Sequence, residues 1–307
     1  MIESEKPDKS EKPNIYLSNR GYIIKKKNLT PKRDSKLRSE LTVSPFQIDG
    51  YSNKPVPSFK LYLENHNKYY LPRFYGIEHF GEPEKNYLID CGEDIDLSFN
   101  GKLREQQIPI AHKMINALHD KGGGILNLGC GFGKTILALY ILTKMKKKTL
   151  IIVHKEFLMN QWYERIREFI PEARVGIIQQ KKIEIDNKNI VIGMLQSIST
   201  KSYENKTFDS FGLTIVDEAH HLGAEVFSRA LPKISTKYMI GLSATLDRKD
   251  GLRKVFEWYI GNIAYTSKEK NEDYVEVNII NFTSDDPKYS KVENSYNGKP
   301  NFPKMIN

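Results

Sequence analysis

The sequence predicts an α/β domain in which helices cover both faces of a parallel sheet. Short apolar runs recur from about residue 101 to 265, and amphipathic stretches separate several of them. This alternation is typical of a parallel sheet that is buried on both faces. Three polar motifs each follow an apolar run: Gly129–Thr135, Asp217–His220 and Ser243–Thr245. Ligands of such sheets bind beyond the carboxyl ends of the strands. We therefore expect the three motifs to share one binding edge.

The individual elements follow from the spacing of the apolar residues. The stretches 135–146 and 156–169 have the amphipathic pattern of helices. Near-continuous apolar runs predict strands at 124–128, 149–153, 175–178, 190–194, 213–216 and 238–242.

Three further segments flank this domain. Residues 1–40 are rich in charged and polar residues, with basic clusters at Lys25–Lys27 and Lys32–Arg33, and are expected to form a flexible, disordered basic arm. Residues 41–100 contain short aromatic and aliphatic runs broken by Gly, Pro, Asn and Asp. That pattern predicts a small β-rich or α+β accessory domain. Residues 266–307 turn polar again, with one further expected strand.

The aromatic residues of the accessory domain allow two interpretations. Lys60, Lys68 and Arg73 interleave with them, which is compatible with a surface where nucleic-acid bases stack on rings. Aromatic side chains in so small a domain more often form its core, and we favour this second interpretation.

Composition limits the class of protein. The chain has 307 residues, a net charge of +9, 39% hydrophobic residues and no apolar leader or membrane-spanning run. The charge favours a polyanionic partner, with nucleic acid first and an anionic membrane surface second, although a solvated lysine-rich surface explains it equally well. The two cysteines cannot form a zinc site by themselves and suggest no disulfide framework. We expect an intracellular, soluble protein with no membrane attachment.

The first polar motif has the composition of a loop that holds nucleotide phosphates. Glycines allow backbone N–H groups to face an anion, Lys134 can reach the β- and γ-phosphates, and the Thr135 hydroxyl can bind Mg²⁺. A tight turn would explain the glycines but not these two residues. The strict pattern has glycine at the position of Leu128, but the G-x-G-K-T core is intact. The expected ATP contacts are Leu128, Gly129, Cys130, Gly131, Phe132, Gly133, Lys134 and Thr135.

The other two motifs supply acids and hydroxyls. Asp217 and Glu218 follow an apolar run, and a nucleotide–Mg²⁺ site needs one carboxylate for the metal and another to orient the attacking water. Paired acids after a strand can also simply start a helix. Ser243, Ala244 and Thr245 follow the last run. Their hydroxyls can contact the acidic motif and sense the γ-phosphate.

In this order, the motifs resemble those of the first motor domain of superfamily 2 helicases and translocases, over about residues 101–265. Gly129–Thr135 resembles motif I, Asp217–His220 a DEAH-type motif II and Ser243–Thr245 motif III. The resemblance implies a P-loop RecA-like fold, with ATP and Mg²⁺ as ligands. It also implies catalytic roles for Lys134, Asp217 and Glu218, metal binding by Thr135 and Asp217, and coupling roles for His220, Ser243, Ala244 and Thr245.

Further segments extend the resemblance. Leu103–Gln107 is similar to the family's L-R-x-x-Q element, which implies that Gln107, helped by Arg104, recognises adenine. Ile151–Lys155, followed by Gln161–Trp162, resembles motif Ia, and Leu195–Ser197 resembles motif Ib. In the family these two motifs touch the backbone of DNA or RNA, which implies contacts from His154, Lys155, Gln196 and Ser197.

Two details place the chain near one branch of the family. Gln161–Trp162 and Ala244–Gly251 resemble the XPB-like branch, including the poxvirus-type transcript-release helicases and related enzymes of large DNA viruses. A viral protein of this kind would act in the host cytoplasm or the virion. Arg248–Lys249–Asp250 differs from the Arg-Glu-Asp of XPB itself, so a role in opening duplexes is not carried over.

The family's motor also needs a second RecA-like domain, whose arginines stabilise the transferring phosphate. No Q-x-x-G-R-x-x-R-type motif follows residue 251, so 266–307 is expected to be a linker toward a second motor domain that is absent or that another chain supplies. We expect ATP–Mg²⁺ binding with slow hydrolysis by this chain alone. The alternative is a non-catalytic nucleic-acid-binding or regulatory module that retains an ATP site. A metabolic P-loop kinase would need a substrate-binding lid, and the second and third motifs leave it little room.

Overall fold

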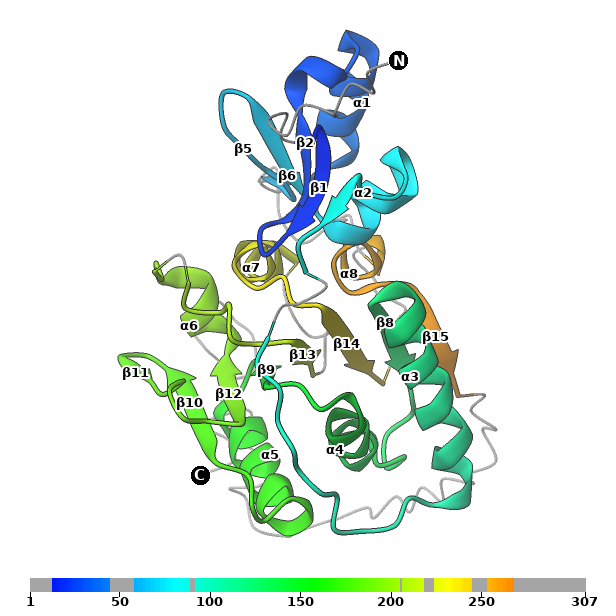
Figure 1. The fold of residues 1–307 in the computed structure, drawn as a ribbon, viewed down its shortest axis with the longest axis vertical. Coiled ribbons are helices and arrows are strands. Elements are labelled where there is room, and N and C mark those ends of the chain that lie inside the picture. The colour runs from blue at the N-terminus through cyan, green and yellow to red at the C-terminus, as the bar shows by residue number, and fades with distance from the viewer. Residues whose placement is uncertain are drawn as a thin grey trace, which may run out of the picture. The chain divides into compact units, whose positions relative to one another are not determined.

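The computed structural model describes residues 13–44, 58–88, 92–204, 206–217, 224–244 and 253–267. Two large sheets and the helices around them make up this part of the chain (Figure 1). Within it, no helix is both long and apolar enough to cross a membrane.

The larger sheet confirms the predicted parallel α/β architecture. Its strand order is β11-β10-β12-β9-β13-β14-β8-β15, and every neighbouring pair is parallel except β10 and β11. The strands are β8 (Gly123–Asn127), β9 (Thr149–Val153), β10 (Val175–Gln179), β11 (Lys182–Ile183), β12 (Ile190–Met194), β13 (Leu213–Val216), β14 (Tyr238–Ser243) and β15 (Ile263–Thr266).

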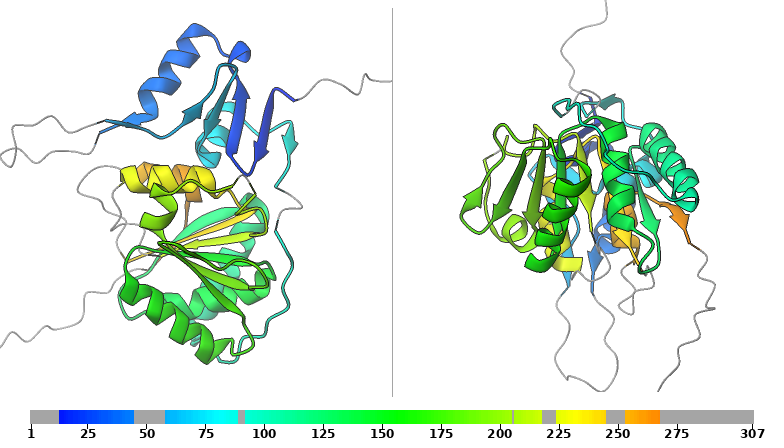
Figure 2. Two further views of the ribbon diagram at one scale, coloured as in Figure 1. Left: turned by 90° about the vertical axis from the view of Figure 1, so that its left-hand side faces the viewer. Right: turned by 90° about the horizontal axis from the view of Figure 1, so that it is seen from below.

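Helices cover both faces of this sheet (Figure 2). Side chains that alternate along one strand enter different apolar clusters: Leu150 and Ile152 join one, Ile151 and Val153 the other. Both faces of β9 are therefore buried, which is why its sequence is apolar after Thr149. One face packs against α3 (Ile108–Lys121), α4 (Lys134–Met145) and α5 (Glu156–Phe169), and the other against α6 (Leu195–Thr200), α7 (Ala224–Ala230) and α8 (Arg253–Ile260).

The smaller sheet is the core of an α+β accessory module, as the sequence predicts. Its strand order is β5-β6-β2-β1-β7, antiparallel except for the pair β1–β7. The strands are β1 (Ile15–Ser18), β2 (Gly21–Lys25), β5 (Leu63–Glu64), β6 (Lys68–Leu71) and β7 (Lys85–Asn86). Around them lie α1 (Pro31–Glu40), α2 (Arg73–Phe80), the short 3-10 helix η1 (Lys26–Asn28) and a ladder of β3 (Thr42–Val43) with β4 (Phe59–Lys60). Two further 3-10 helices belong to the domain of the larger sheet: η2 (Glu105–Gln107) precedes α3, and η4 (Leu231–Lys233) follows α7.

The expectation of a flexible arm over residues 1–40 needs correction from residue 13 onward. Residues 21–24 of β2 are all buried, and α1 places Leu37 in the same core. The basic residues that suggested an arm lie at the ends of these elements: Lys25 closes β2, and Lys32 stands in the first turn of α1. Residues 1–12 lie outside the described residues.

The expected end of the accessory domain at residue 100 also needs correction. Ile95 and Leu97 pack in the apolar cluster that contains α4 and α5, and Asp94 pairs with Lys147 of the larger sheet's domain. The accessory module therefore ends near residue 88 rather than 100. Residues 268–307, which include the expected linker and its strand, are not among those described.

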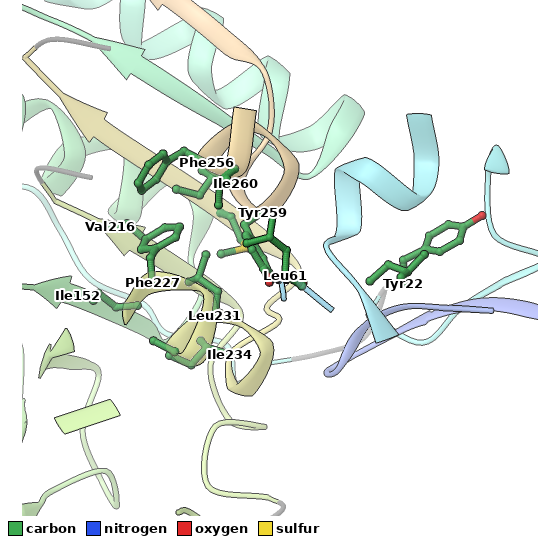
Figure 3. Close-up of a cluster of buried hydrophobic side chains, with 14 of the residues drawn as sticks. Tyr22, Leu61, Ile152, Val216, Phe227, Leu231, Ile234, Phe256, Tyr259 and Ile260 are labelled. Carbon is green, nitrogen blue, oxygen red and sulfur yellow. Dashed lines mark hydrogen bonds between the residues drawn. The ribbon is translucent and has the colours of Figure 1, made fainter. Parts of the chain in front are cut away.

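The accessory module and the larger sheet share one apolar cluster (Figure 3). Tyr75 of α2 meets Trp258 of α8 edge to face, with ring centroids 5.1 Å apart. The buried Tyr259 hydroxyl donates a 2.6 Å hydrogen bond to the Leu61 carbonyl. Arg73 donates to the carbonyls of Lys237 (2.9 Å) and Lys121 (3.1 Å). These contacts join the two sheets through buried side chains and backbone groups.

Candidate nucleotide-binding site

The phosphate-type loop connects β8 to α4. Gly131 and Gly133 have φ angles of +75° and +86°, a left-handed conformation that glycine adopts without steric cost. A Cβ added at Gly131 would meet nothing within 4 Å, so the space above the loop is open. The Lys134 ammonium donates a 3.1 Å hydrogen bond to the Leu128 carbonyl, which brings its charge back across the loop. An open loop of this shape, with a cation and a helix N-terminus beside it, fits a phosphate group.

Gln107 holds the loop from the side. Its side chain is 2% exposed. Its Oε1 accepts a hydrogen bond from the Arg104 backbone N–H, and its Nε2 donates to the Phe132 carbonyl, both at 2.9 Å. A Cβ at Gly133 would lie 2.7 Å from this nitrogen, which is a second reason for glycine there. Recognition of adenine by Gln107 and Arg104 stays a prediction, and the structure adds that Gln107 supports the loop.

Asp217 lies directly after β13, two strands from β8. Its side chain is 6% exposed, and its backbone N–H donates to the Ile152 carbonyl at 3.0 Å. The indole Nε1 of Trp162, a fully buried residue of α5, donates a 2.7 Å hydrogen bond to Asp217 Oδ2. This bond fixes the orientation of the carboxylate. The role of Trp162 was missed by sequence reasoning, because the two residues are 55 positions apart.

Ser243 lies between the loop and the acidic residue. It ends β14, the strand between β13 and β8, and it pairs with Asn127 in register. It is fully buried, and its carbonyl accepts a 2.9 Å hydrogen bond from the Leu128 N–H. The described parts of all three predicted motifs thus meet at the carboxyl edge of the sheet. Glu218, Ala219, His220 and Thr245 lie outside the described residues, whereas Ala244 is described and half-buried.

The donor set fits Mg²⁺ bound together with phosphate. The Thr135 hydroxyl and the Asp217 carboxylate offer oxygen atoms, and Mg²⁺ commonly takes one or two protein oxygens plus phosphates and water. Among the described residues, no group of three or more His, Cys, Asp or Glu side chains forms a self-sufficient metal site. A metal at this edge would therefore depend on a bound nucleotide for its other ligands.

The residues expected to touch nucleic acid follow two neighbouring strands. Gln196, after β12, donates from Nε2 to the His154 carbonyl, after β9, at 2.9 Å. Lys155 and Gln196 are exposed and His154 is half-buried. Ser197 is buried instead, and its Oγ accepts a hydrogen bond from the Gln180 N–H at 2.9 Å. The structure thus brings the two motifs together, while contact with nucleic acid stays a prediction.

A cavity of about 630 Å³ lies elsewhere, between α2, α8 and the C-terminal end of α3. Arg73, His119, Lys237 and Trp258 are among the residues that line it, and none of the predicted site residues does. The motifs, rather than this cavity, locate the site.

The chain is similar to several known proteins. Residues 100–248 match the family described as type III restriction enzyme, res subunit. A provisionally named ATP-dependent RNA helicase of Acanthamoeba polyphaga mimivirus is 37% identical over 291 residues, covering 93% of this chain and 56% of that protein. A provisionally named helicase of Invertebrate iridescent virus 3 is 29% identical over 72% of this chain and 70% of its own length.

A solved structure shows the same fold. The UvsW helicase from bacteriophage T4 matches 81% of this chain and 98% of the compared chain, with a TM-score of 0.55 and 16% identity. The present chain spans about half the length of the mimivirus protein, at 56%.

Proposed function

Since the chain contains the first RecA-like domain of a superfamily 2 helicase, we propose that it is the ATP-binding half of a nucleic-acid-dependent ATPase, a helicase or translocase. One observation carries the proposal. The phosphate-type loop, the buried Asp217 and the buried Ser243 lie at one carboxyl edge of the parallel sheet. Each of them also stands at the position of its motif in the family's order.

Each residue has a chemical task in this proposal. Lys134 and the loop N–H groups bind the phosphates, and Thr135 with Asp217 would hold Mg²⁺, which supplies positive charge against the phosphate oxygens when bound. Trp162 keeps Asp217 oriented through its indole N–H. Glu218, the next residue along the chain, would orient and deprotonate the attacking water.

The partner would be a DNA or RNA backbone, bound near Lys155 and Gln196. The hydrogen bond between Gln196 and the His154 carbonyl links the two strand ends that carry these residues. On the other side of the edge, the bond from Leu128 to Ser243 links the phosphate-type loop to the third motif. Each link joins the ends of two neighbouring β-strands, one pair at the expected nucleic-acid contacts and one pair at the ATP site.

Fast turnover would need a second RecA-like domain. In related phosphoryl-transfer systems an arginine supplied by a partner raises the rate about 10³–10⁵-fold. We therefore expect slow hydrolysis from this chain alone, and faster hydrolysis from a longer polypeptide or a second chain that supplies such a domain. A second domain that left the rate unchanged would contradict this part of the proposal.

The experiment measures ATP turnover with and without single-stranded DNA or RNA, in wild type and in Glu218→Gln. Glu164→Gln, at an exposed position of α5, is the matched control. Turnover that depends on Glu218 and rises with nucleic acid supports the ATPase. Identical turnover in wild type and Glu218→Gln under every condition would contradict it, and ATP binding without turnover would favour a regulatory module instead.

A further inference from the structure

The cavity of about 630 Å³ lies at the amino edge of the parallel sheet, opposite the candidate nucleotide site. Its lining includes Gly122, Tyr238 and Asn262, which stand at or just before the starts of β8, β14 and β15. The accessory module closes the other side with α2 and with one residue each of β1 and β7. Pockets of about 300–1,000 Å³ hold small organic ligands. The cavity therefore has the size of a ligand site of its own.

Arg73, the first residue of α2, places a cation at the wall of this cavity. Its Nη1 donates a 2.9 Å hydrogen bond to the Lys237 carbonyl, and its Nη2 donates a 3.1 Å bond to the Lys121 carbonyl. Gly122, with a φ angle of +78°, leaves room for the guanidinium, because a Cβ there would lie 2.2 Å from Nη2. The two carbonyls and the glycine thus hold the guanidinium in place.

The positive charge of Arg73 has no acid bonded to it. Among the described residues, no carboxylate forms an ion pair with Arg73, and its buried Nε has no hydrogen-bond partner. Burial lowers the pKa of the guanidinium to about 10 and the charge of Glu82 opposes this shift, so Arg73 stays charged at neutral pH. Withdrawing a charge from water without an opposite partner is costly. A ligand that brings a negative group would offset this cost.

The other charges that line the cavity lie mostly in water. The exposed ones are Glu78, Glu82, Asp120, Lys121 and Lys254. Glu257 is engaged by Arg253, which donates to it at 2.9 Å, and Lys237 adds a half-buried cation. Water and salt screen the exposed charges, whereas a charge withdrawn from water acts at a lower effective dielectric constant. The half-buried cations therefore set the preference of the cavity, and they favour an anion.

Apolar side chains complete the wall of the cavity. Leu88 and Leu118 are buried there, and Phe74 and Trp258 are half-buried. Trp258 is held edge to face against Tyr75, with ring centroids 5.1 Å apart. The cavity thus offers cations and aromatic rings to one ligand.

We propose that this cavity binds a small organic anion, a carboxylate or a phosphate that carries a flat apolar group. The negative group would meet Arg73 and Lys237, and the apolar group would lie against Phe74 and Trp258. Because the accessory module and the RecA-like domain both supply lining residues, the bound anion would stabilise the contact between them. The inference goes beyond the proposed ATPase and does not depend on it.

The two tryptophans of the chain provide a local measurement. Trp258 lines the cavity, whereas Trp162 is fully buried beside Asp217. In protein labelled with fluorotryptophan, the resonance that disappears in Trp258→Phe assigns both fluorine NMR signals. The nucleotide site is saturated with a non-hydrolysable ATP analogue and Mg²⁺, so that added anions do not occupy the phosphate-type loop.

Benzoate, phenyl phosphate and the neutral benzamide are then titrated. Both anions should shift the Trp258 resonance with a dissociation constant of about 1 mM, the order expected for such small probes. The Trp162 resonance should not move. Benzamide should bind about tenfold more weakly, because it keeps the ring but lacks the charge. The anion with the higher affinity identifies the preferred group, carboxylate or phosphate.

Variants test the part that Arg73 plays. Arg73→Gln removes the charge and should weaken benzoate binding about tenfold or more, the usual effect of losing a charged hydrogen-bond partner. Arg73→Lys should retain part of the affinity. Lys113→Gln removes a cation of α3 that does not line the cavity, and it should bind like wild type. If Arg73→Gln does not fold, the comparison of benzoate with benzamide in wild type decides.

The outcomes separate this inference from the proposed function. The inference is overturned if neither anion shifts the Trp258 resonance up to about 10 mM, if benzamide binds as well as benzoate, or if Arg73→Gln binds like wild type. The ATPase proposal would still stand, because it is tested at Glu218 in another site. Conversely, a chain that binds benzoate beside Trp258 but never hydrolyses ATP would support the inference while the ATPase proposal fails.

Discussion

The two sheets of this molecule offer their surfaces to ligands in different ways. The parallel sheet is buried on both faces, so only the residues that follow its strands, such as Asp217 after β13, can reach a ligand. The accessory sheet packs against α1 and α2 on one face, and residues within its strands that point to the other face, such as Lys68 and Tyr70, are half-buried. A sheet that is enclosed by helices therefore binds at its edge, whereas a half-covered sheet can bind on its face.

The difference extends to how polar groups are held. At the edge of the parallel sheet, the polar contacts of Asp217 and Gln107 are buried. In the accessory module, the ion pairs of Glu64 lie at the surface, with its side chain 26% exposed. Substitutions at the buried contacts should therefore cost more stability than substitutions at the surface pairs.

The largest effect is expected from Trp162→Phe, which keeps an aromatic ring but removes the donor to Asp217. A hydrogen bond to a charged group contributes about 1.5–3 kcal/mol, and the free energy of unfolding should fall by that order. The Mg²⁺ concentration needed for binding of a fluorescent ATP analogue should rise, because the carboxylate loses its orientation. Chemical denaturation and Mg²⁺ titration measure the two effects.

Tyr163→Phe, at the next and more exposed position of α5, is the control for Trp162→Phe. A double-mutant cycle with Asp217→Asn isolates the contact. An additive cycle, with an unchanged Mg²⁺ requirement in Trp162→Phe, would show that Trp162 only fills space.

A smaller effect is expected from alanine in the phosphate-type loop. Gly131→Ala and Gly133→Ala both place a side chain in the left-handed region, at about 1–2 kcal/mol each. Gly133→Ala also meets Gln107 Nε2 at 2.7 Å, whereas Gly131→Ala meets open space. Gly133→Ala should therefore be the less stable of the two in denaturant, and the Gln107→Ala background should remove most of the difference. Equal stabilities of the two variants would mean that the Gln107 side chain moves aside with no loss in the free energy of unfolding.

The smallest effect is expected from Glu64→Gln. Hydrogen bonds from Arg38 and Lys26 lower the pKa of the Glu64 carboxyl to about 2, below its unfolded value. A carboxyl whose pKa is lowered by folding stabilises the folded state at pH values above its pKa in the unfolded chain. This contribution is lost as the pH falls toward the pKa of the folded state. Surface ion pairs contribute about 1 kcal/mol or less, so the variant should be slightly less stable at neutral pH.

The pH dependence checks that assignment. The difference in stability between wild type and Glu64→Gln should shrink as the pH falls through about 4 and nearly vanish near pH 2. Glu78→Gln, at an exposed position of α2, is the matched control. A difference that grows on acidification would contradict the lowered pKa.

The parallel sheet could be predicted from the sequence because burial on both faces makes its central strands near-continuously apolar. The expected strand 149–153 and helix 156–169 coincide with β9 and α5. In the accessory module, β2 was hidden within a basic segment, because its apolar residues are few and lysines follow directly. Half-buried and buried residues alternate along β6, but its residues, Lys-Tyr-Tyr-Leu, do not alternate between polar and apolar types, so which face is covered could not be predicted.

Contacts between distant residues could not be predicted. The bond of Trp162 to Asp217 and the support of the loop by Gln107 depend on side-chain directions that only the folded chain sets. The order of the three motifs located the binding edge, but not the groups that hold it in place.

The strand order also has a consequence for how the chain folds during synthesis. The strand β8, which leads into the phosphate-type loop, pairs with β14 and β15, and both emerge from the ribosome much later. Until then the mostly apolar strand β8 has no partner strand on either edge. Late pairing of this kind slows folding and favours aggregation. The nucleotide-binding edge is therefore among the last parts of the sheet to assemble, and a chain stopped before residue 263 would expose it.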